Sequence, residues 1–90
     1  MSKEFGIRLY YLRTHKTGCT QYQVARHLHI DRSTYTYYEC GKTEPSVKTL
    51  WELARFFGVS CDELLDPRIS ENELADYEIF KSNRKQKARE

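Results

Sequence analysis

Apolar residues recur at steps of three and four positions along most of this chain, with short polar segments between the apolar stretches. The first stretch contains Phe5, Leu9 and Leu12. This spacing places side chains on one face of an α-helix. We expect the inward-facing residues of all the helices to form one core: Leu9, Leu12, Val24, Ala25, Leu28, Ile30, Tyr35, Leu50, Leu53, Ala54, Phe57, Val59 and Leu64. The pattern therefore predicts an all-α fold.

The starts and ends of these helices are marked by capping residues. A Ser or Thr followed three positions later by Glu or Gln forms a capping box, in which each side chain bonds an amide at the helix start. The chain has three such pairs: Thr20 with Gln23, Ser60 with Glu63, and Ser70 with Glu73. Asp31 and Ser46 are further expected N-caps, and Gly41 and Gly58 are expected to end helices in a left-handed conformation.

The segment from Thr20 to Gly41 reads as two short helices joined by a tight turn. The first helix ends near Leu28, and the second begins after Asp31 and runs to Glu39. A connection this short makes the helices cross at a steep angle. In such a helix-turn-helix unit, the second helix can enter the major groove of DNA.

The residues of this unit and those that follow it resemble the Cro and phage-repressor type of helix-turn-helix domain, which includes the xenobiotic-response-element-like regulators. The match covers roughly residues 5–66 and rests on these positions: Thr20, Gln21, Val24, Ala25, Leu28, Ile30, Arg32, Ser33, Thr34, Tyr38, Glu39, Gly41, Lys42, Pro45, Leu50, Leu53, Ala54, Phe57, Gly58, Val59, Ser60, Asp62, Glu63, Leu64 and Leu65. The resemblance implies a five-helix, repressor-like bundle over residues 1–67. It also implies a sequence-specific, DNA-binding transcriptional regulator with the helix Arg32 to Glu39 in the major groove.

Within that helix, Tyr35 and Tyr38 are expected to face the core. The residues expected to face DNA bases are Arg32, Ser33, Thr36 and Tyr37. Arginine can donate two hydrogen bonds to guanine O6 and N7, and serine can pair with several base edges. The alternative for Arg32 is a contact with phosphate alone.

Contacts with the DNA backbone are expected from both ends of the motif. The resemblance implies that Gln21 binds a phosphate and supports Arg32, and that Thr20, Lys42 and Thr43 add backbone contacts. We expect Tyr22 and Arg26 to face solvent.

The resemblance also implies a structural ion pair between Arg13 of the first helix and Glu39, which would otherwise bring an unpaired carboxylate close to DNA.

Two positions depart from the family pattern. His29 stands where glycine is common in the turn, so the usual left-handed backbone would require φ > 0 from a histidine. The stretch from Leu12 to Cys19 is one residue longer than the usual spacing, and we expect the extra residue in a loop around His15 to Gly18.

Composition narrows the class of protein only modestly. The 90 residues carry 15 basic and 13 acidic side chains, a net charge of +2, which neither requires nor excludes a nucleic-acid partner. The three cysteines form no CxxC pair, and no apolar run is long enough to cross a membrane, so a cytoplasmic location is expected. No metal site, cofactor, small-molecule ligand or enzymatic motif is evident.

The C-terminal part lies outside the resemblance. Residues 68–82 are predicted to contain a sixth helix, and residues 83–90 a basic, disordered tail. Four apolar residues of the helix need burial: Leu74, Tyr77, Ile79 and Phe80. The helix can fold back on its own domain or pair with a second copy, and we favour pairing in a homodimer on a double-stranded DNA operator. The rival to DNA binding is a protein-interaction adaptor or antitoxin-type module.

Overall fold

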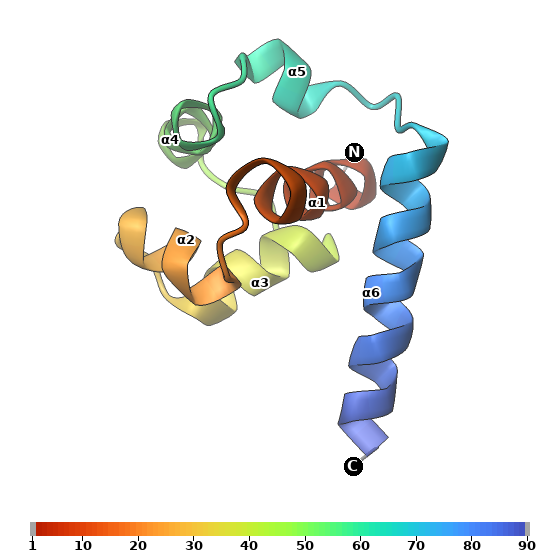
Figure 1. Ribbon diagram of the computed structural model, residues 1–90. Coiled ribbons are helices and arrows are strands. Elements are labelled where there is room, and N and C mark those ends of the chain that lie inside the picture. Colours follow the sequence, from red (N-terminus) through yellow and green to blue (C-terminus); the bar gives the residue numbers. More distant parts are fainter. Residues whose placement is uncertain (1, 90) are drawn as a thin grey trace.

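The computed structural model describes residues 2–89, with side chains for residues 3–82, and within this part it is helical without strands. Its elements are α1 (Ser2–Tyr11), a π-helix η1 (Leu12–Thr17), α2 (Gln21–His27), α3 (Arg32–Cys40), α4 (Val47–Phe57), α5 (Cys61–Leu65) and α6 (Glu71–Arg89). Helix α1 lies at the centre, with α3 beneath it, α4 and α5 above and α6 along the right side (Figure 1). The predicted all-α class with a sixth helix is confirmed.

Capping residues define the helix starts as the sequence predicts, with one exception. The Thr20 and Ser60 capping boxes both form, and the backbone N–H of Glu73 donates to Ser70 Oγ at 3.1 Å. The exception is Asp31, which occupies the N-cap position of α3 but makes no capping hydrogen bond through its side chain. The expectation that its carboxylate caps α3 is therefore wrong.

One hydrophobic cluster contains most of the predicted core. The predicted core residues with the least exposure are Leu9, Val24, Ala25, Tyr35, Leu53, Ala54, Phe57 and Leu64. Leu12, Ile30, Leu50 and Val59 are only partly buried against it. The predicted core list omitted four buried hydrophobic residues, Phe5, Ile7, Tyr38 and Tyr77.

The extra residue between Leu12 and Cys19 is not in a loop. The chain from Leu12 to Thr17 continues α1 as a π-helix, and the backbone N–H of Gly18 donates to the carbonyl of Arg13, five residues earlier, at 2.8 Å. A π-helical turn holds one more residue than an α-helical turn. The extra residue therefore widens the helix, and Gly18, with φ 68°, ends it.

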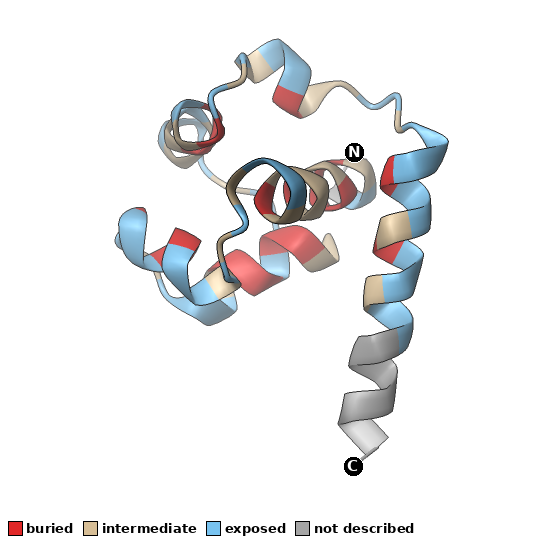
Figure 2. Ribbon diagram, in the orientation of Figure 1, coloured by how far each residue is buried: buried red, intermediate tan, exposed pale blue. Residues whose placement is uncertain are grey.

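Helix α6 folds back onto α1. Tyr77 is 5% exposed, and the ring of Tyr10 lies 6.0 Å from that of Tyr77 and 4.5 Å from that of Phe80. The buried positions of α6 lie on the side that faces α1 (Figure 2). The preference for burying Tyr77 and Phe80 against a second copy is therefore wrong, whereas Leu74 and Ile79 stay exposed.

The backbone of α6 is also longer than predicted. It is helical up to Arg89, where a disordered tail over residues 83–90 was expected. The side chains of that tail lie outside the described residues.

Candidate nucleic-acid interface

Helices α2 and α3 form the predicted helix-turn-helix, with four residues, 28–31, between them. Leu28 ends α2, and the backbone N–H of Ile30 donates to the carbonyl of Ala25 at 3.0 Å. His29 has φ 59°, so the predicted left-handed backbone at this position is confirmed. Its side chain is exposed, and histidine adopts a positive φ more often than most residues other than glycine.

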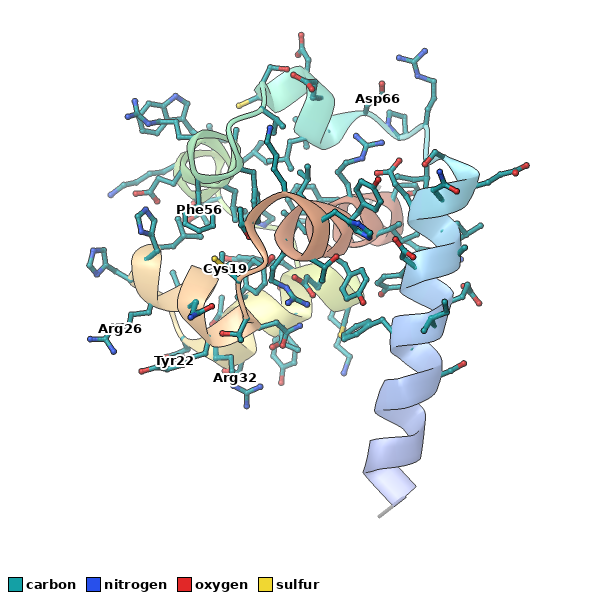
Figure 3. All side chains as sticks on the ribbon, viewed as in Figure 1. Cys19, Tyr22, Arg26, Arg32, Phe56 and Asp66 are labelled. Atoms are coloured by element: carbon teal, nitrogen blue, oxygen red, sulfur yellow. The ribbon has the colours of Figure 1, made fainter. Side chains whose placement is uncertain are left out.

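The outward face of α3 presents three of the four residues predicted to contact bases. Arg32, Ser33 and Tyr37 are exposed, and Arg32 points away from the bundle at its lower edge (Figure 3). Lys42, just beyond α3, lies with its Nζ 5.4 Å from the centre of the Tyr37 ring. Thr43 is also exposed. This face therefore combines hydrogen-bond donors, positive charge and an aromatic ring.

The fourth residue, Thr36, does not face outward, so that part of the prediction is wrong. It is 6% exposed, and its Oγ1 donates a hydrogen bond to Gln21 Oε1 at 2.9 Å. Successive residues of an α-helix are 100° apart, so Thr36 lies on the flank of α3 beside the buried Tyr35. That flank packs against the start of α2, which removes the hydroxyl from the surface.

Gln21 is bound within the protein through both ends of its amide. Its Oε1 accepts from Thr36, and its Nε2 donates to Glu39 Oε1 at 2.9 Å. Gln21 thus supports two α3 residues, Thr36 and Glu39, and its expected support of Arg32 stays a prediction. Thr20, the neighbouring N-cap, is exposed, and its Oγ1 accepts from the Gln23 amide at 3.1 Å.

Glu39 is fully buried and ion-paired with Arg13. Arg13 Nε donates to Glu39 Oε2 at 2.6 Å and Nη2 donates to Oε1 at 3.1 Å, while Nη1 binds the carbonyl of Cys19. Burial opposes the charge on Arg13, but the hydrogen bond to Glu39 and its negative charge prevail and raise the pKa of the guanidinium. The negative charge of Glu39 at the end of α3 is therefore already neutralised within the protein.

Tyr22 and Arg26 add to the exposed surface of α2. Arg26 Nη1 lies 3.5 Å from the Tyr22 hydroxyl, and Tyr22 is 56% exposed. Both side chains point outward on the side of the molecule from which Arg32 projects (Figure 3). Tyr22 and Arg26 face solvent, as expected. Their spacing of four residues in the sequence did not by itself indicate a function.

The described residues offer no sign of other chemistry. No group of three or more His, Cys, Asp or Glu side chains among them could hold a metal ion. Within the same part of the chain, none of the helices has the length and apolar character needed to cross a membrane.

Two short helices joined by a tight turn, the second of them with an exposed outer face, are the features of a helix-turn-helix protein. Residues 9–64, more than half of the sequence, match the family model described as Helix-turn-helix, and the chain belongs to this family.

Several curated proteins are similar to this chain. YonR of Bacillus subtilis (strain 168), an SPbeta prophage-derived uncharacterized HTH-type transcriptional regulator, is 49% identical over 68% of this chain and 56% of its own length. The HTH-type transcriptional activator BcrR of Enterococcus faecalis is 40% identical over 69% of this chain and 30% of its own length. The HTH-type transcriptional regulator AnsR of Bacillus subtilis (strain 168) is 47% identical over 64% of this chain and 49% of its own length. The chain thus spans about half or less of these relatives. No solved structure matches it significantly.

Proposed function

We propose that this chain is a sequence-specific DNA-binding transcriptional regulator, acting in the cytoplasm, that places α3 in the major groove. The observation that carries the proposal is the exposed face of α3, where Arg32, Ser33 and Tyr37 project while the carboxylate of Glu39 is buried and paired. A helix that approaches DNA with donors outward and its acidic group neutralised avoids repulsion from the phosphates. The names of the similar proteins, all transcriptional regulators, support the same function.

Each exposed residue has a defined role in this proposal. Arg32 donates to a guanine edge, Ser33 pairs with a neighbouring base, and Tyr37 offers its ring and hydroxyl. Lys42 and Thr43, beyond the end of α3, and Thr20, before the start of α2, contact phosphates. Gln21 contacts a phosphate only if the DNA displaces its side chain from the hydrogen bonds to Thr36 and Glu39.

The assignment of Arg32 is tested with an operator selected from random duplex DNA. We expect Arg32→Ala to weaken binding to the selected operator by about 1 to 3 kcal/mol and to relax the preference at one base position. Arg26→Ala is the matched control because it removes the same charge from the exposed surface of α2. Equal losses in the two variants, with base preference unchanged in both, would show that Arg32 contacts only phosphate.

Salt dependence separates DNA binding from an adaptor role. Release of counterions makes the logarithm of the DNA affinity fall linearly with the logarithm of salt concentration, with a slope of about −0.9 for each phosphate contact. A protein-binding module has no reason to show such a slope on duplex DNA. Failure to select any DNA sequence, together with weak and salt-insensitive binding, would favour the adaptor.

We further propose binding as a homodimer on half-sites about 34 Å apart, because one helix-turn-helix supplies few base contacts. With α6 folded back, Tyr77 and Phe80 are engaged with α1, so we expect the exposed Leu74 and Ile79 or the exposed side of α4 to supply the contact. Analytical ultracentrifugation with one and two half-sites tests this stoichiometry. One chain bound per two-half-site duplex at saturation would contradict it.

A further inference from the structure

We propose that α6 positions the DNA-reading helix, with Tyr77 supplying the hydrogen bond that completes the C-terminus of α3. Tyr77 is a positioning residue here, since it touches α3 and not the DNA. The inference rests on the proposed function for its effect on DNA binding, whereas its effect on the end of α3 stands independently.

One carbonyl at the end of α3 is satisfied by a donor from a distant part of the chain. An α-helix leaves its last four carbonyls without intrahelical partners. Two of them are satisfied locally at the end of α3, because Lys42 N–H donates to the carbonyl of Tyr37 at 3.0 Å and Gly41 N–H to that of Tyr38 at 3.2 Å. The next carbonyl, that of Glu39, accepts from the Tyr77 hydroxyl at 2.9 Å, across 38 residues of sequence and in a buried position.

The same residue of α3 is held from two other helices through its side chain. Arg13 and Gln21 both donate to the Glu39 carboxylate. Tyr10 connects the two sets of contacts, because its ring lies edge-on to Tyr77 and 5.3 Å from the Arg13 guanidinium. Glu39 is therefore fixed at both its backbone and its carboxylate, and α6 contributes the backbone contact.

Helix α6 is itself anchored, so its hydroxyl is a fixed donor. Arg8 Nε binds Glu73 Oε2 at 2.6 Å, and both side chains are nearly buried. One turn further along, His15 Nε2 lies 2.5 Å from Asp76 Oδ2. Helix α6 lies beyond residues 9–64, the part that matches the family model. The donor at the end of α3 therefore comes from a part of the chain that the family model does not cover.

Loss of this donor is expected to act on DNA binding through the last turn of α3. Tyr37, proposed to contact a base, and Lys42, proposed to contact a phosphate, both belong to that turn or follow it directly. A turn that is already ordered before binding costs less free energy to immobilise against DNA. The Tyr77 hydroxyl thereby contributes to operator affinity from a helix that does not touch the operator.

The test compares Tyr77→Phe, which keeps the ring and removes only the hydroxyl, with Asn72→Ala at a neutral, exposed position of α6. Amide hydrogen exchange is measured on the full-length chain. The Lys42 amide reports the end of α3, and the Val59 amide, which bonds the Ala54 carbonyl at 3.0 Å, reports the equivalent end of α4. We expect Tyr77→Phe to speed exchange at Lys42 by about fivefold to tenfold more than at Val59, the effect of losing one ordinary hydrogen bond.

Operator affinity is measured on the same proteins at a temperature where circular dichroism shows each to be fully folded. We expect a loss of about fivefold to tenfold for Tyr77→Phe and none for Asn72→Ala. Equal acceleration at Lys42 and Val59 would overturn the inference, because it would indicate a general loss of stability. Faster exchange at Lys42 with unchanged operator affinity would overturn the link to DNA binding. If the natural chain selects no DNA sequence, the proposed function fails, and the exchange data alone decide whether α6 holds α3.

Discussion

Replacing Gly6 by alanine is expected to destabilise this protein, although the same change in most helices is stabilising. Gly6 lies in α1 with a negative φ, and alanine has a helix propensity about 1 kcal/mol better. A Cβ at this position, however, would overlap the carbonyl oxygen of Glu39 and lie 2.9 Å from that of Tyr38. These are backbone atoms at the end of α3, so no side-chain rotation relieves the overlap.

The size of the effect follows from the two opposing terms. Forcing an extra carbon into a packed contact typically costs about 1 to 3 kcal/mol, and contact with backbone on a second helix favours the upper end. After the propensity gain, a net loss of about 1 to 2 kcal/mol remains. In a domain of this size that corresponds to a fall in Tm of roughly 4 to 16 °C.

Thermal and urea unfolding of Gly6→Ala, followed by circular dichroism, measure this change. Gly18→Ala is an informative comparison, because its Cβ would meet open space and only the strain of φ +68° opposes it. Its expected cost is about 1 kcal/mol. An unchanged or raised Tm for Gly6→Ala would refute the close packing of α1 on α3.

Three further substitutions test individual features. His29→Gly should stabilise the fold by up to about 1 kcal/mol in urea unfolding, because glycine adopts the positive φ without strain, and a clear loss would point to a packing role for the imidazole. Tyr35→Phe should cost little at pH 7, since the buried hydroxyl makes no hydrogen bond within the described residues. Burial, and after it the negative charge of Glu39, raise the pKa of Tyr35 above its unfolded value near 10. The contribution of the neutral Tyr35 to the free energy of unfolding is therefore complete below about pH 10 and is lost as the pH rises. At pH 10.5 to 11 the natural chain should therefore lose more stability than the phenylalanine variant. Equal losses of stability in the two proteins would contradict this. Thr36→Val should cost about 1 kcal/mol without altering base preference, and altered preference in a binding selection would restore Thr36 as a base-contacting residue.

Local hydrogen bonding explains why so much of the fold could be predicted from sequence. A capping box joins residues three positions apart, so the pairs at Thr20, Ser60 and Ser70 identify helix starts without knowledge of the tertiary structure. Glycines at 41 and 58 end helices for an equally local reason, the left-handed backbone that they adopt. The direction in which Tyr35 and Tyr38 face followed from helical spacing alone.

The predictions that failed depend on how helices meet. Thr36 lies on the flank of α3, and only the angle between α2 and α3 decides whether that flank faces solvent or Gln21. Ile7 is 2% exposed and stands three residues before Tyr10, whose ring contacts Tyr77 of α6. The folding back of α6 rests on ion pairs with partners more than 60 residues away, such as Arg8 with Glu73. No local pattern contains that information.

Because η1 is a π-helix, the first helical segment holds an additional residue without a change in the orientation of the residues before and after it. One residue inserted into an α-helix rotates everything after it by 100°. Here the additional residue is contained between Leu12 and Gly18, so Arg13 still reaches Glu39 and Cys19 still leads into α2. The wide turn therefore accommodates the additional residue without displacing either end of the segment. In this fold, that residue lies directly beside the buried ion pair of Arg13 and Glu39.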